Sequence, residues 1–219
     1  MRITLLAFIF GIFSLSSFAA GSGGGGIPSS AGTGNSQQLS PEKLAAKNYK
    51  NGINAKERAW KYEGKAEAAT KEKKRAKYLE KAQKQYKKAI DLQAQVLRIN
   101  PAHYQAANEL GYALRKTGEF KKAIGAYSFA LQQKPDFFEA IEYRGEAFLG
   151  MGLLKESQDA YIYLFRRSPE LAEMLLQAME KWVAGEGNKE QFEFSEWVTE
   201  RRMLAGAVQK LSLSNTTWN

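Results

Sequence analysis

Three prolines at a fixed spacing place the strongest limit on what this chain can fold into. Pro101, Pro135 and Pro169 follow one another at intervals of 34 residues. Other residues recur with the same period, in the pairs Leu110 and Arg144, Gly111 and Gly145, Gly118 and Gly152, Phe120 and Leu154, Ala123 and Ser157, Tyr127 and Tyr161, and Ala130 and Leu164. A constant period of this size indicates stacked units of supersecondary structure, each burying its apolar face against its neighbours.

One unit of the repeat has the pattern of a helical hairpin. Residues 102–116 place apolar or small side chains at helical spacing, and Thr117-Gly118 ends that run. Residues 119–133 show a second helical stripe, which Pro135 ends because the residue before a proline avoids the helical conformation. The fold class is therefore predicted to be all-α.

Gly111 lies in the middle of the first predicted helix. A glycine there costs about 1 kcal/mol relative to alanine, so its presence indicates a close approach between helices. We expect Gly111 to face Ala123 or Ala130 across the hairpin, and Gly145 to do the same in the next unit.

The period, the turn glycines and the terminal prolines together resemble the tetratricopeptide repeat (TPR) family. Residues 102–135 and 136–169 match its pattern best. Departures from the family pattern stand at Ala107, Ile141, Arg144 and Ser157. The resemblance implies a right-handed solenoid of about three to four helical hairpins, which binds other proteins and has no catalytic activity.

The flanking segments show weaker versions of the same pattern. Residues 41–101 are predicted to form a degenerate first hairpin, with a first helix within 44–69 and an enlarged, charged connection around 71–75. Residues 170–211 are predicted to be capping helices that cover the last apolar face, and residues 212–219 a loose tail.

The N-terminus has the pattern of a secretory signal over residues 1–20. Arg2 precedes an apolar run over 3–13, and Ser17-Phe18-Ala19 fits the small-x-small cleavage rule. A retained anchor is the alternative. The chain has no cysteine, so neither lipid attachment after the apolar run nor disulfides are expected. Residues 21–40 carry no charge and are predicted to be a disordered, Gly/Ser-rich linker. We expect a protein exported across the inner membrane into a bacterial periplasm.

The positive charge of the chain is confined to one segment. Residues 41–98 hold 17 Lys/Arg and 7 Asp/Glu, whereas residues 99–219 hold 14 and 16. Such a segment could attract an anionic envelope surface or polymer, or it could be a solvated helical face that keeps the protein soluble. Nucleic acid is not an expected partner of an exported protein.

The sequence offers no catalytic or cofactor-binding pattern. Its single histidine, His103, stands at a predicted helix start, and no carboxylate set with metal-ligand spacing surrounds it. We therefore predict no enzyme activity, no metal and no cofactor.

The expected binding site is the concave groove, which the first helix of each hairpin lines in such solenoids. The groove residues predicted from helical spacing are Gln105, Asn108, Tyr112, Arg115, Glu139, Glu142, Tyr143 and Glu146. Family members that grip a peptide's terminal carboxylate use Lys, Arg and Asn here, so the glutamates argue against that mode. They favour a basic or amide-rich segment, with Arg115 pairing with an acid. An envelope scaffold or assembly factor is the predicted function, and an envelope-associated module using its basic hairpin is the alternative.

Overall fold

The computed structural model describes residues 39–185 and 191–216, with side chains as far as Ala207. The predicted signal and almost all of the predicted linker lie outside the described residues. Eight helices make up the described chain: α1 (Pro41–Glu67), α2 (Glu72–Ile99), α3 (Tyr104–Lys116), α4 (Phe120–Gln133), α5 (Phe138–Gly150), α6 (Leu154–Phe165), α7 (Pro169–Val183) and α8 (Phe192–Thr216). None of these helices is long and apolar enough to cross a membrane.

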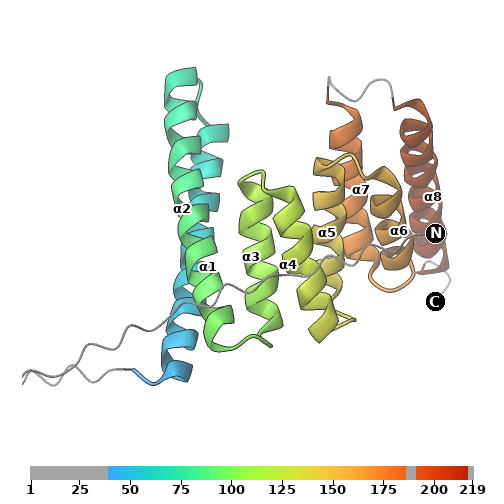
Figure 1. Ribbon diagram of the computed structural model, residues 1–219. Helices are drawn as coiled ribbons and strands as arrows, with labels where there is room; N and C mark the ends of the chain where they lie inside the picture. The colour runs from blue at the N-terminus through green and yellow to red at the C-terminus, as the bar shows by residue number, and fades with distance from the viewer. Residues whose placement is uncertain (1–38, 186–190, 217–219) are drawn as a thin grey trace, which may run out of the picture. The chain divides into compact units, whose positions relative to one another are not determined.

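The helices pack as antiparallel pairs in chain order, α1 with α2, α3 with α4, α5 with α6, and α7 with α8 (Figure 1). Each pair packs against the next through α2 and α3, α4 and α5, and α6 and α7. The first helices of successive pairs also touch, since α3 contacts both α1 and α5, and α5 contacts α7. This arrangement confirms the predicted all-α, TPR-like succession of hairpins.

The glycines of the repeat serve two structural purposes. Gly118 and Gly152 have φ of 83° and 70°, which L side chains rarely adopt, and they turn the chain between paired helices. Gly111 allows a close approach, because a Cβ atom there would lie 2.7 Å from the ring of Tyr127. A Cβ atom on Gly145 would lie 2.7 Å from a methyl group of Leu175 on α7.

The predicted partner of Gly111 is therefore wrong, whereas Gly145 does lie against Ser157, the predicted small residue of its own hairpin. The prediction matched each glycine with the small residues of its own hairpin. In the structure the space over Gly111 is taken by the fully buried Tyr127 ring. The Ser157 hydroxyl donates a hydrogen bond to the Gly145 carbonyl oxygen at 3.0 Å, but the space where a Cβ on Gly145 would lie is taken mainly by Leu175 of the following hairpin.

The first hairpin differs from the prediction at its connection. Residues 72–75 form the start of α2, so only residues 68–71 join the two helices. The helices are correspondingly long, 27 and 28 residues against 13 and 14 for α3 and α4. Figure 1 shows their connected ends extending past the end of α3. Lysine, alanine and glutamate all favour helix, which explains why this charged stretch is helical.

The last hairpin closes the C-terminal core. Leu175, Leu176 and Met179 of α7 are fully buried together with Leu164 of α6, and Phe194 of α8 packs against this cluster. The helix α8 continues to Thr216, so the prediction that 212–219 form a loose tail is wrong for its first five residues.

His103 is a helix cap. The backbone N–H of Ala106 donates a hydrogen bond to Nδ1 of His103 at 3.2 Å, and the imidazole lies 4.8 Å from the Tyr49 ring, measured between centroids. A side-chain acceptor at this position satisfies one of the free amides of the first turn of α3.

Candidate functional site

The predicted groove residues lie on α3 and α5, which are neighbouring first helices. The structure adds residues of α1, the first helix of the preceding hairpin. We call the combined set the first-helix surface: Lys56 and Trp60 on α1; Gln105, Asn108, Glu109, Tyr112 and Arg115 on α3; Glu139, Glu142, Tyr143 and Glu146 on α5.

A line of three aromatic rings joins the three hairpins. The indole N–H of Trp60 donates a hydrogen bond to the Tyr112 hydroxyl at 2.7 Å, and the two rings meet edge to face at 5.8 Å. The Tyr112 and Tyr143 rings also meet edge to face, at 5.2 Å between centroids. Such contacts are worth about 0.5–1.5 kcal/mol beyond the burial of the rings, so this line helps to hold successive first helices together.

Two cations lie against the aromatic line. The Lys56 ammonium is 4.9 Å from the Trp60 ring and 5.3 Å from the Tyr112 ring, and it pairs with Glu109 at 2.5 Å. The Arg115 guanidinium is 5.2 Å from the Tyr112 ring and 5.4 Å from the Tyr143 ring. These distances are within the range of cation–π attraction.

Arg115 is committed to an internal ion pair. Its guanidinium bonds to the Glu146 carboxylate, and only 12% of its side chain is exposed. Burial is the largest single influence and lowers the pKa of Arg115, but the Glu146 charge together with Tyr127 and Tyr112 more than offsets it, so the pKa is raised. The side chain therefore links α3 to α5.

The deepest members of the surface are Asn108 and Glu142, which are one period apart. They are 4% and 0% exposed. Neither the Asn108 carbonyl oxygen nor either Glu142 carboxyl oxygen has a hydrogen-bond partner among the described residues. Burial, together with the nearby Glu146 charge, raises the pKa of Glu142 to about 9, although Arg115 acts in the opposite direction. We therefore expect the Glu142 carboxyl to be protonated at neutral pH.

Glu142 is expected to make the protein less stable as pH rises. Below pH 4.5, the ordinary pKa of the group, the Glu142 carboxyl is protonated in both the folded and the unfolded chain. Between pH 4.5 and about 9 this carboxyl ionises only in the unfolded chain. The free energy of unfolding should then fall by up to about 1.4 kcal/mol per pH unit. In thermal melts, Glu142→Gln should match the native protein near pH 4.5 and melt at higher temperature at pH 8.

The exposed Glu139 on the same helix supplies the control, because Glu139→Gln should leave the pH dependence of stability unchanged. Parallel native and Glu142→Gln curves would contradict this assignment.

The accessible part of the first-helix surface is smaller than the predicted set. Glu139 is exposed and Gln105 partly exposed, and no hydrogen bond or ion pair joins either to another described residue. Trp60 is 41% exposed, whereas Tyr112 and Tyr143 are half-buried. A partner would meet the rings from one side, with Gln105 and Glu139 one turn or more away along their helices.

The sequence analysis missed Lys56, Trp60 and Glu109 as members of this surface. The 34-residue period fails before α3, so spacing alone could not align α1 with the later first helices. A tryptophan within the basic segment was the one signal that the sequence offered.

The fold and this surface together define a class: an all-α, TPR-like array of helical hairpins whose first helices share an aromatic and ionic surface. The described residues contain no group of three or more side chains suited to hold a metal ion.

No protein-family model matches the sequence, and a comparison with curated proteins finds no match. Solved structures that are similar to part of this chain include two TPR domains. The TPR domain of Arabidopsis OM64 is 18% identical, with 61% of this chain and 98% of that one covered at a TM-score of 0.43. The first TPR domain of Spaghetti (RPAP3), bound to the HSP90 peptide SRMEEVD, is 18% identical, with 63% and 96% covered at a TM-score of 0.43. The assignment of the fold depends on this chain's own period and helix packing.

Proposed function

We propose that this protein is a non-catalytic interaction module that binds a segment of a partner protein across the first-helix surface. The observation that carries the proposal is the continuous line of Trp60, Tyr112 and Tyr143 over three hairpins, ending in a partly exposed indole. Tryptophan, tyrosine and arginine dominate the energetic centres of protein interfaces.

The charges of the surface indicate the chemistry of the partner segment. Arg115 and Lys56 are paired internally, so the more accessible charges are carboxylates, above all the exposed Glu139. We therefore propose a basic or amide-rich segment. Arg115 already pairs with Glu146. We therefore no longer expect Arg115 to pair with an acidic group of the partner.

We place this activity in the bacterial cell envelope, as a scaffold or assembly factor in the periplasm. This part of the proposal depends on the signal-like pattern of residues 1–20 and on the absence of cysteine.

Site-specific photocrosslinking in exporting cells tests the proposal. A photoreactive phenylalanine analogue at Gln105 or Glu139 should trap a partner, and the same group at the exposed Gln132 of α4 should not. With Tyr112→Ala and Tyr143→Ala combined, adduct formation should fall about tenfold or more, since two aromatic contacts at an interface are worth at least about 1.4 kcal/mol. Circular dichroism should stay helical. Equal trapping from Gln132, or trapping that is indifferent to the tyrosines, would reject the first-helix surface.

The projecting end of the first hairpin supports a second candidate function, binding to an anionic membrane surface or polymer. The rings of Tyr62 and Tyr78 stack there at 6.5 Å, with the ammonium groups of Lys65, Lys74 and Lys81 5.6–6.0 Å from one or other ring. None of these three lysines has an ion pair within the described chain.

Substitution of basic residues and the effect of salt on binding distinguish the two candidate functions. Replacing Lys73, Lys74 and Arg75 by serine should leave protein trapping nearly intact. If the hairpin binds an anionic surface, the same change should weaken sedimentation with phosphatidylglycerol vesicles, and 0.5 M salt should abolish it because exposed charges are screened over a few ångströms.

A further inference from the structure

Two grooves in this structure are copies of one another. Residues from Leu97 on α2 to Phe129 on α4 line the first groove, and residues from Leu131 on α4 to Tyr163 on α6 line the second. Every lining position of the first groove has its equivalent 34 residues later in the second. Their volumes are 430 and 480 Å³. The chain therefore contains one apolar groove built twice, and the differences between the copies reveal what each is suited to bind.

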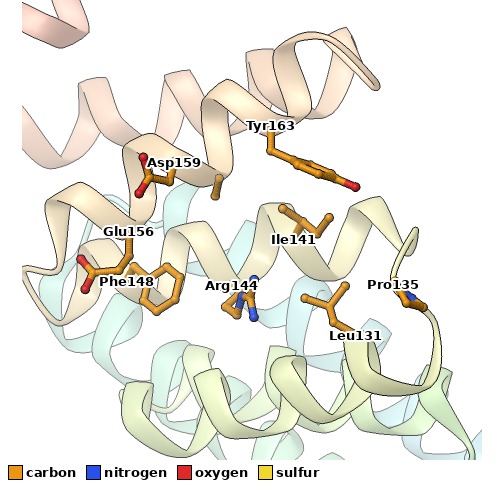
Figure 2. A pocket seen from close by; sticks show the side chains of 9 residues that line it. Leu131, Pro135, Ile141, Arg144, Phe148, Glu156, Asp159 and Tyr163 are labelled. Atoms are coloured by element: carbon orange, nitrogen blue, oxygen red, sulfur yellow. The ribbon is translucent and has the colours of Figure 1, made fainter.

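The important difference is at one position of the first helix. Leu110 lines the first groove, and its equivalent in the second is Arg144. The surroundings stay apolar, since Leu131, Ile141 and Phe148 line the second groove next to the arginine (Figure 2).

This groove is separate from the first-helix surface. Arg144 is two residues from both Glu142 and Glu146. At 100° per residue it therefore lies about 160° around α5 from each of them, on nearly the opposite face of the helix. A ligand in the groove would contact α4, α5 and α6, whereas the first-helix surface involves α1, α3 and α5.

The Arg144 guanidinium makes few polar contacts with the rest of the described chain. Its Nη1 donates one hydrogen bond, to Ser128 Oγ at 3.2 Å, and its guanidinium lies 5.7 Å from the Phe148 ring. No carboxylate among the described residues pairs with it, and its Nε is buried without a hydrogen-bond partner. Burial lowers the pKa of Arg144.

Folding does not explain an arginine at this position. Burying a cation without a counter-charge is costly, and leucine serves at the equivalent position one hairpin earlier. A guanidinium held in an apolar groove is suited to a carboxylate joined to an apolar body.

We propose that the groove around Arg144 binds a segment of a partner protein that carries a single glutamate or aspartate beside an apolar side chain. The carboxylate pairs with the Arg144 guanidinium, and the apolar side chain packs against Leu131, Ile141 and Phe148. Glu156 and Asp159 at the α6 side of the groove (Figure 2) disfavour a strongly acidic segment, and Asp159 is already paired with Lys155.

Nuclear magnetic resonance with two matched peptides tests this proposal on the folded chain. The probes are acetyl-leucyl-glutamyl-phenylalanine amide and the same peptide with glutamine in place of glutamate. The glutamyl peptide should shift the Arg144 Nε–H signal and the amides around residues 131–163 in a saturable way, with a dissociation constant on the order of 1 mM. The glutaminyl peptide should bind about tenfold more weakly or worse, because it cannot form the ion pair.

The variant Arg144→Leu installs the residue of the preceding groove. It should lose about tenfold or more in affinity for the glutamyl peptide and bind both peptides equally. Its melting temperature should equal or exceed that of the native protein, so the loss would not reflect misfolding. Equal binding of the glutamyl peptide by native protein and Arg144→Leu, or no binding at about 10 mM peptide, would overturn the proposal. Shifts confined to Tyr112 and Tyr143 would also overturn it, and would leave the first-helix surface as the binding site.

Discussion

Replacing Gly111 by leucine is expected to lower the free energy of unfolding by about 3 kcal/mol, near the upper end of overpacking costs. The first added carbon would already lie 2.7 Å from the Tyr127 ring, and that ring is fully buried between helices. Neither the helix backbone nor the ring can give way without opening the α3 and α4 pair. Gly145→Leu should also destabilise, but less, because the flexible side chain of Leu175 can move partly aside.

Two other glycines provide matched controls in thermal and urea melts. Gly118→Ala meets no neighbouring atom but places a side chain at φ 83°, which should cost about 1 kcal/mol. Gly125→Ala, in open space on α4, should stabilise by about 0.5–1 kcal/mol through helix propensity. If Gly111→Leu melts like the native protein, the close contact between α3 and Tyr127 is wrong.

Removing Arg115 is expected to have the second largest effect. Arg115→Ala leaves the Glu146 carboxylate without its partner and takes away the cation beside the Tyr112 and Tyr143 rings. Breaking a buried pair costs about 3–5 kcal/mol, and the 25% exposure of the Glu146 side chain reduces our expectation to about 2–3 kcal/mol. Urea denaturation at pH 7 measures the loss.

A double-mutant cycle isolates the ion pair from the packing of the arginine side chain. Glu146→Gln alone should cost less than Arg115→Ala, because the amide can still accept a hydrogen bond. Combining the two changes should cost less than the sum of the single effects, by about 1 kcal/mol. Strictly additive effects would show that the pair between α3 and α5 contributes nothing to stability.

The repeat itself was predictable because its signals are local. A glycine with positive φ after the first helix and a proline after the second act within a few residues of chain, as Gly118 and Pro135 do. The period then placed α5 and α6 at the same offsets as α3 and α4. The prediction failed at residues 72–75, where a run of charges was interpreted as a connection although lysine favours helix.

The candidate site was predictable only as a helix face. Helical spacing groups Asn108, Tyr112 and Arg115 on α3, and the period assigns their counterparts on α5. Spacing within a helix does not reveal how deeply each position is covered, since that depends on the helices packed beside it. Glu142 is therefore fully buried, although the same spacing argument treats it like the exposed Glu139.

Contacts between hairpins were decided by the tertiary structure. Gly145 meets Leu175 and Trp60 meets Tyr112 because the neighbouring hairpin supplies the second side chain. Among the described residues, no neighbouring hairpin supplies a carboxylate that pairs with Arg144. The local chain fixes each helix and its apolar face through spacing and backbone preference. Which residue fills the space opposite depends on the packing of long side chains across helices, and no repeat period records that packing.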